Sequence, residues 1–466
     1  MLSMQILGRA IRFGYLVVIA RLLTPEDVGI FTYGIAFYLA LLGLAQVGQN
    51  AVLSTRLGRK RRGVEELLAH SLSVRLVVTT TVMLLAGAAI WLTEADRTTR
   101  WVVLFFLLAL SARSLVLWVR HTYVGLERAT WIPRYEVTFR GLEALVGSGA
   151  LLLGAGLLEV CALHTVVWTL EATFCIRRLR LLEAYRPRLG FDRRFLRKLI
   201  GLSAFFTLNF WLIDLYLQAG VVTMKYIQPD TATVGFYGVA WQFSITLLVL
   251  PFALAEGILP GLSRAWRMRD ASRLGDLPLA IKLALLAGAV AATLATAYAP
   301  FFIDALFGPR YAKIAETFVW LCWSVGPYAV TLLASQGLNA ANAWRHAVVV
   351  TAAPVAVHLI LMVALVPDYG LAGAAASAVA GAVAGSLVGC LLLGRRLPVM
   401  RTGSWLVPLL LLGVAGAVML HPATPRDLAG AVVTVLLLVA FRYLGVFDPA
   451  ERARIGEIIA RRSRAP

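Results

Sequence analysis

The sequence predicts an all-α protein that crosses a membrane about fourteen times. Of its 466 residues, 60% are hydrophobic and only 15% are charged, whereas a soluble chain normally carries about a quarter charged residues. The charged residues also gather in short clusters between long apolar runs. Such a chain holds more apolar side chains than a water-soluble core can bury, so the surplus is expected to face lipid.

The individual spans follow from the length that a helix needs, about 20 mainly apolar residues, to cross the hydrocarbon. Successive runs of this kind lie near residues 4–23, 28–50, 67–92, 101–120, 134–156, 160–176, 199–221, 234–257, 278–299, 315–334, 346–366, 370–393, 404–420 and 427–446. The first run carries Arg9 and Arg12 and continues into a repeated stretch. We therefore interpret it as a membrane helix and not as a cleavable signal peptide.

The distribution of basic residues predicts the orientation. Arginine and lysine cluster after the even-numbered spans, at 56–62, 177–198, 264–273, 395–401 and 452–464. The loops after odd-numbered spans hold one or two basic residues at most. Because positive loops stay on the cytoplasmic side, this alternation predicts a multi-pass protein of the bacterial cytoplasmic (inner) membrane with both termini in the cytoplasm.

Two stretches of the chain match each other. Residues 21–34 read RLLTPEDVGIFTYG and residues 225–238 read KYIQPDTATVGFYG, so that Gly29 corresponds to Gly235. The offset spans an even number of helices, which predicts two lobes in parallel pseudo-twofold repeat with a binding site between them. The predicted division begins with an N-terminal six-helix lobe (1–180) and a basic cytoplasmic linker (181–198). A C-terminal six-helix lobe (199–396), two additional transmembrane helices (397–447) and a basic cytoplasmic tail (448–466) follow.

Four landmarks along the chain carry a family resemblance. The stretch ARLLTPEDVGIF at 20–31 resembles the signature of polysaccharide-biosynthesis flippases, the O-antigen and teichoic-acid-type exporters of the multidrug/oligosaccharidyl-lipid/polysaccharide exporter superfamily. ILPGLSR at 258–264, LFGPRYAKIAE at 306–316 and VPDYGLAGAAAS at 366–377 are similar to further landmarks of that family, in the same order. Family members usually have several more residues before the first helix.

The resemblance implies two bundles of six helices around a central cavity, followed by two extra helices. It also implies a transporter, not an enzyme, that moves a polyprenyl-pyrophosphate-linked oligosaccharide across the membrane by alternating access. The expected partners are this glycolipid substrate, membrane lipids, and a polysaccharide polymerase or glycosyltransferases.

Arginines within the apolar spans are the first candidates for a binding site. An ionised side chain at the centre of a membrane helix costs at least ~2.5–3.5 kcal/mol, so it faces a cavity or a partner, or snorkels to the headgroups. The guanidinium group binds phosphate oxygens bidentately and keeps its charge. The candidates for substrate binding are Arg9, Arg12, Arg75, Arg113 and Arg140. Arg9 and Arg12 are three residues apart and share one helix face.

The seventh span carries a second polar group, Asn209, Asp214 and Gln218. Asp214 lies near mid-membrane and shares a face with Gln218. Either Asp214 pairs with one of the arginines, or it carries a coupling proton or Na⁺. Glu143, Glu171, Glu256 and Lys282 are further candidates for a cavity or an interface between lobes.

Three other functions compete with the glycolipid flippase. A multidrug or organic-cation antiporter of the same superfamily would favour acidic residues in the first lobe, where this chain has more arginine than acid. A peptidoglycan-precursor flippase would differ in the lipid that it binds. A membrane-embedded polymerase, ligase or glycosyltransferase needs a sizeable external loop, and every predicted external loop here is short.

Other chemistries find little support in the sequence. The net charge of +19 fits cationic loops beside anionic lipid better than nucleic-acid binding. Neither the cysteines nor the histidines show the spacing of a metal site, and no catalytic motif or cofactor fingerprint is present.

Overall fold

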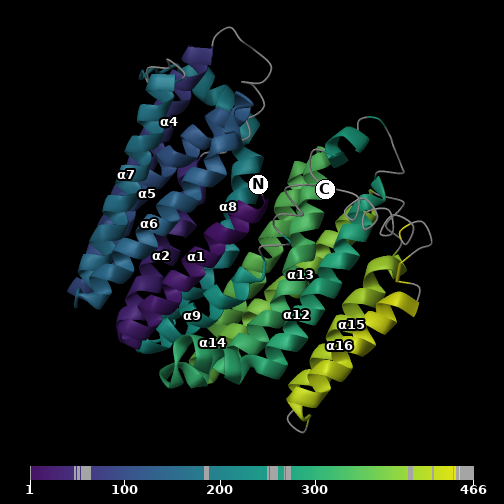
Figure 1. The fold of residues 1–466 in the computed structure, drawn as a ribbon. Helices are drawn as coiled ribbons and strands as arrows, with labels where there is room; N and C mark the ends of the chain where they lie inside the picture. Colours follow the sequence, from purple (N-terminus) through teal and green to yellow (C-terminus); the bar gives the residue numbers. More distant parts are fainter. Residues whose placement is uncertain are drawn as a thin grey trace, which may run out of the picture. The chain divides into compact units, whose positions relative to one another are not determined.

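The computed structural model describes residues 2–46, 49, 53, 64–182, 188–248, 251, 261–266, 268, 274–396, 402–421, 424–443, 446–447 and 451. Within these residues every regular element is a helix (Figure 1). The elements are α1 (Leu2–Leu22), α2 (Pro25–Gln46), α4 (Val64–Thr93), α5 (Arg97–Gly125), η1 (Ala129–Trp131), α6 (Ile132–Leu152), α7 (Leu157–Leu182), α8 (Arg193–Ile227), α9 (Thr231–Thr246), α12 (Asp276–Phe307), η2 (Pro309–Ile314), α13 (Ala315–Ala340), α14 (Trp344–Gly394), α15 (Thr402–Leu420) and α16 (Arg426–Tyr443).

The predicted spans coincide with these helices, which confirms the all-α polytopic class, except that α9 covers only the first half of the span 234–257: it ends at Thr246, and Leu247 and Leu248 form a turn. Two spans, 346–366 and 370–393, fall in the single element α14. The backbone of α14 is not helical at Gly370, where φ is 54°, so this residue separates the two spans. The positive φ explains the glycine, because a side chain there would be strained.

Eight helices in the described part of the chain are long and apolar enough to cross a membrane. The helices α1 and α6 each carry several charged residues. These two helices pack against each other. Two helices of the N-terminal part that each carry several charged residues therefore share an interface.

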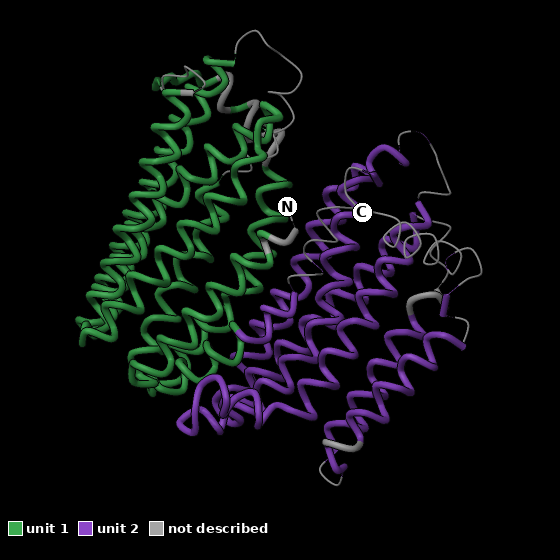
Figure 2. Tube along the Cα trace, viewed as in Figure 1, with its two compact units in different colours: residues 1–242 green, residues 243–466 purple. Residues whose placement is uncertain are grey.

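The chain forms two compact units, residues 1–242 and 243–466 (Figure 2). The first unit includes α8 and most of α9, since α8 packs along α2. The predicted six-helix lobes are defined by the repeat and not by compactness, so that division stays a prediction. The predicted basic tail from 448 lies outside the described residues apart from Glu451.

Helix starts in the first unit are set by side-chain caps. The hydroxyl oxygen of Thr24 accepts a bond from the Asp27 backbone N–H at 3.2 Å and begins α2. Asp96 accepts bonds from two backbone N–H groups at the start of α5. Asp230 accepts bonds from the backbone N–H of Ala232 and of Thr233 at the start of α9. Such caps satisfy the N–H groups that have no partner within the helix.

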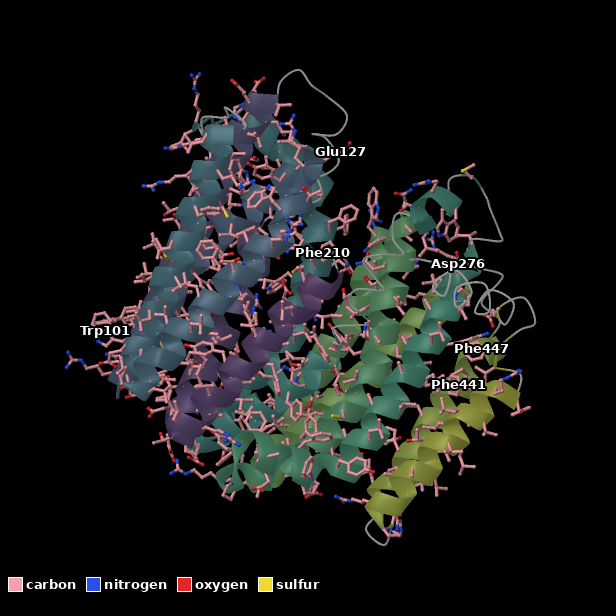
Figure 3. The ribbon with its side chains drawn as sticks, in the orientation of Figure 1. Trp101, Glu127, Phe210, Asp276, Phe441 and Phe447 are labelled. Atoms are coloured by element: carbon pink, nitrogen blue, oxygen red, sulfur yellow. The ribbon has the colours of Figure 1, made fainter. Side chains whose placement is uncertain are left out.

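The second unit is built on α12, α13 and α14, which pack in chain order, with α15 and α16 lying against α12. Glycines allow close helix crossing: a Cβ atom on Gly288 of α12 would lie 2.4 Å from the Cα of Gly326 of α13. Phe441 and Phe447, whose ring centroids are 6.1 Å apart, belong to a small core with Leu279 of α12 (Figure 3).

Candidate functional site: a buried charge cluster in the N-terminal unit

Four helices of the first unit bring ionisable side chains together. His164, Trp168 and Glu171 follow one another at four and three residues along α7, so they share one helix face. Arg140 and Glu143 lie three residues apart on α6. Because α7 packs against both α5 and α6, the charges of these helices meet inside the unit.

The cluster contains two arginines and two glutamates in contact. Arg140 donates one hydrogen bond to Glu143 and another to Glu171. Arg113 of α5 donates to the second oxygen of Glu171, with Nη1 3.4 Å from Oε1. Glu171 has an exposed fraction of 0%, and Arg113 one of 12%. Charges buried in a membrane protein require such compensation. Within these four residues the two positive charges equal the two negative charges.

Trp168 is the apolar centre of the cluster. Its indole Nε1 donates to Glu143 Oε2 at 3.0 Å. The guanidinium groups of Arg113 and Arg140 lie 5.6 and 4.8 Å from the centre of its ring, in cation–π geometry. Tyr38 of α2 meets the same ring edge-on at 5.3 Å. The indole therefore contacts both arginines and the Glu143 carboxylate.

Arg12 of α1 is the unbalanced charge of this site. It lies on the helix stripe of Gly8 and Tyr15, which contact α6 at Val137 and Gly147. Its guanidinium interacts electrostatically with Arg140, Arg113, Glu143 and Tyr38. The Arg12 side chain is nevertheless exposed, and no carboxylate among the described residues lies within ion-pair distance of it.

The result is a solvent-accessible cation beside a neutral buried cluster. Two of the neighbouring charges, on Arg113 and Arg140, repel Arg12. A bound anion would relieve that repulsion and supply the missing hydrogen-bond acceptors. The arrangement is therefore suited to a phosphate or diphosphate group. Arg9, the other predicted arginine of α1, is half-buried one helical turn away.

Arg75 has a different environment from the other predicted arginines. It is fully buried, and its guanidinium donates to Gln49 Oε1 at 3.3 Å, to the Ser114 carbonyl at 2.7 Å and to the Gln46 carbonyl at 3.2 Å. These acceptors come from α2, α5 and the segment after α2. We therefore interpret Arg75 as a residue that ties helices together, in contrast to the substrate contact considered from the sequence.

The polar group of α8 stands apart from the cluster. Asn209 and Gln218 are buried, and Asp214 is half-buried near the middle of the apolar stretch Ala204–Ile227. Within the described residues, Asp214 makes no ion pair with an arginine. The pairing of Asp214 with an arginine, one of the two alternatives from the sequence, is therefore not formed among the described residues. Of the further candidates, Glu256 lies outside the described residues.

Sequence reasoning did not single out His164, Trp168 or Tyr38. The signal for the first two was present, because the spacing of His164, Trp168 and Glu171 puts polar groups on one face of a predicted membrane helix. Tyr38 gave no such signal, since an aromatic residue in an apolar span is usually a packing residue. No group of three or more metal-ligating side chains is found among the residues that the structure describes.

Comparison with solved structures defines the class of protein. The lipid II flippase MurJ in an inward closed conformation has a TM-score of 0.67 and 14% identity, over 94% of this chain and 97% of that one. An inward-facing multidrug resistance MATE family transporter of the MOP superfamily has a TM-score of 0.66 and 14% identity, over 85% and 96%. Its outward-facing counterpart has a TM-score of 0.63 and 16% identity, over 86% and 95%. The chain thus has the fold of these membrane transporters.

The family follows from the sequence itself. Residues 1–266 match the family described as "Polysaccharide biosynthesis protein". This match covers more than half of the chain, and the chain belongs to that family. No curated protein matches it.

Proposed function

We propose that this protein is a flippase that moves a polyprenyl-pyrophosphate-linked oligosaccharide from the cytoplasmic to the outer leaflet by alternating access. It would serve the assembly of a cell-surface polysaccharide in the bacterial inner membrane, with both termini in the cytoplasm. A polysaccharide polymerase or glycosyltransferases are the partners that such a pathway requires.

One observation carries the proposal: Arg12 is an exposed guanidinium with two arginines nearby and no carboxylate within ion-pair distance among the described residues. A membrane protein retains such a charge at a cost of several kcal/mol only where it has a function. The diphosphate of a polyprenyl-linked sugar offers several anionic oxygens to a planar guanidinium. Membership in the polysaccharide biosynthesis family agrees with a glycolipid as the substrate.

The organic-cation antiporter is the second candidate, and the similarity to MATE transporters gives it the same fold. Charge argues against it. A cationic substrate beside Arg12 would meet repulsion from Arg12, Arg113 and Arg140, while Glu143 and Glu171 are already occupied by hydrogen bonds. A peptidoglycan precursor also carries a diphosphate, so only lipid competition distinguishes that substrate.

Asp214 is the candidate for ion coupling, as a carrier of H⁺ or Na⁺. It is a half-buried carboxylate within an apolar helix and has no arginine partner among the described residues. A charge in this position is costly unless an ion or a proton joins it.

The test is lipid binding by native mass spectrometry on the purified protein. We expect retention of an undecaprenyl-pyrophosphate glycan over the organic cation tetraphenylphosphonium. Arg12→Ala should lower lipid retention about tenfold or more, since a hydrogen bond between charged groups is worth ~1.5–3 kcal/mol. Arg97→Ala, which removes an exposed arginine at the start of α5, should leave it unchanged. Retention of the cation without the lipid would refute the flippase proposal.

A further inference from the structure

His164 is a buried, titratable side chain that is not needed to bind the anion at Arg12. Its exposed fraction is 4%. The ring packs edge-on against Phe106 at 5.1 Å and in a tilted arrangement against Trp168 at 4.4 Å. Its Nδ1 atom lies 2.7 Å from Glu143 Oε1. Its other nitrogen, Nε2, has no hydrogen-bond partner in the described part of the chain.

These contacts assign the neutral tautomer. The Glu143 carboxylate beside Nδ1 favours a proton on that nitrogen, so the neutral ring carries its proton on Nδ1, facing Glu143 Oε1. The lone pair of Nε2 is then available to accept a proton. A second proton would bind at Nε2, and the imidazolium would keep its bond to the carboxylate.

The surroundings determine what that proton would change. The charged or titratable groups around the cluster are Arg12 and Tyr15 of α1, Tyr38 of α2, Arg113 of α5, Arg140 and Glu143 of α6, and Cys161 and Glu171 of α7. With the tyrosines and the cysteine uncharged, the arginines Arg113 and Arg140 balance the two glutamates. The net charge of the whole group is then that of Arg12.

Protonation of His164 would raise this net charge by one. The added charge would lie beside Glu143, whose carboxylate also accepts a hydrogen bond from Arg140. An anion held by Arg12 gains from each additional positive charge nearby, because the low-dielectric interior screens weakly. Loss of the proton would remove that gain. The charge of the anion site therefore depends on a single buried ring.

We propose that His164, oriented by Glu143, is a proton-binding site that couples proton uptake to anion binding in the N-terminal unit. The proposal rests on the flippase function and adds a coupling proton to it, at a position separate from Asp214. Because linkage is reciprocal, the anion would promote proton uptake by as much as the proton promotes anion binding. Proton release from His164 would then accompany release of the diphosphate group.

The experiment measures binding of undecaprenyl pyrophosphate to the full-length protein between about pH 6 and pH 8. We expect the wild type to bind roughly fivefold or more tightly at the acidic end, the lower range of coupling between two sites. His164→Gln should lose this preference for the acidic end and keep only the pH dependence that comes from the terminal phosphate of the ligand. The control is His70→Gln, which removes a histidine that also neighbours a carboxylate, Glu66, at 3.7 Å, and it should retain the dependence.

A pH dependence that is the same in wild type and His164→Gln overturns the coupling and leaves the flippase function standing. A wild type that binds no undecaprenyl pyrophosphate at any pH overturns the flippase function instead. In that case NMR titration of ¹³C-labelled histidine rings in the lipid-free protein decides the proton site. The resonance that is missing from the spectrum of His164→Gln belongs to His164. The proposal requires this resonance to shift with pH in this range, and a resonance that does not shift overturns it.

Discussion

Gly29 of α2 and Gly235 of α9 approach so closely that a Cβ atom on Gly29 would lie 3.0 Å from the backbone nitrogen of Gly235. It would also lie 2.0 Å from the carbonyl oxygen of Thr231. The two glycines occupy the same position in the two repeated stretches of the sequence. The contact continues along the unit, where the hydroxyl groups of Tyr33 and Tyr226 are 3.0 Å apart. The repeat therefore marks a place where two helix starts pack backbone against backbone.

Gly29→Ala should disturb this packing. The added methyl group has no room beside Thr231, and overpacking of this kind costs ~1–3 kcal/mol. Gly149→Ala is the matched control, because no atom lies within 4 Å of its added Cβ position and alanine favours a helix over glycine by ~1 kcal/mol. Thermal unfolding in detergent should show a lower Tm for Gly29→Ala and an equal or higher Tm for Gly149→Ala. An unchanged Tm in Gly29→Ala would contradict the close packing.

The charge balance of the cluster predicts a large effect of Glu171→Gln. This substitution leaves Arg113 and Arg140 with only Glu143 as a buried anion, and breaking a buried pair costs ~3–5 kcal/mol. Glu136→Gln, which affects the more exposed pair of Glu136 with Arg120, should cost at most ~1 kcal/mol. Chemical denaturation would measure both. Adding Arg113→Leu to Glu171→Gln should recover part of the lost stability, and failure to do so would argue against the proposed balance.

Arg75 and Arg12 should respond oppositely to replacement by leucine. Arg75→Leu removes the hydrogen bonds of the guanidinium to Gln49 and to the carbonyls of Ser114 and Gln46, and a hydrogen bond of a charged group is worth ~1.5–3 kcal/mol. Arg12→Leu removes a charge that Arg113 and Arg140 repel, so the free energy of unfolding should be unchanged or higher. Urea denaturation of the two variants distinguishes a structural arginine from a binding one. Equal destabilisation by both would place Arg12 in a structural role.

Asp96, in the turn between α4 and α5, predicts a pH-dependent stability. Partial burial acts to raise the pKa of its carboxyl, but hydrogen bonds from Thr99 and Thr98 hold this pKa below its usual value. A lowered pKa in the folded state means that the stabilisation is present above about pH 4 and is lost as the pH falls through the folded value. Asp96→Ala should therefore cost ~1 kcal/mol at pH 7, and the difference in Tm from wild type should shrink in acid.

The control for this cap is Asp96→Asn, because asparagine also caps helices but does not titrate. Its difference from Asp96→Ala should persist at low pH. A wild type whose advantage over Asp96→Ala did not change with pH would show that the ionised carboxylate is not the stabilising species.

The sequence predicted the helices well because a membrane span is a local property of about 20 residues. The predicted runs became helices, apart from the second half of 234–257, and the break in α14 at Gly370 coincides with the predicted start of the span 370–393. The pairing of charges was not predictable in the same way. Glu171 lies 58 residues from Arg113 and 31 from Arg140, so only the packing of α5, α6 and α7 shows that they meet. Arg75 looked like Arg12 in the sequence, and only the structure shows that Arg75 is surrounded by hydrogen-bond acceptors whereas Arg12 is not.

A last consequence concerns biosynthesis. Lys282 of α12 is 2% exposed, and its ammonium group donates to both carboxylate oxygens of Glu451, at 2.7 and 3.0 Å. The ribosome makes Lys282 169 residues before this partner. Throughout that interval the translocon must accommodate a lysine at a cost of several kcal/mol, or let its long side chain reach the headgroups. The partner that neutralises Lys282 is thus made long after the helix that carries it, and a protein released from the ribosome before Glu451 would retain a buried lysine without this carboxylate.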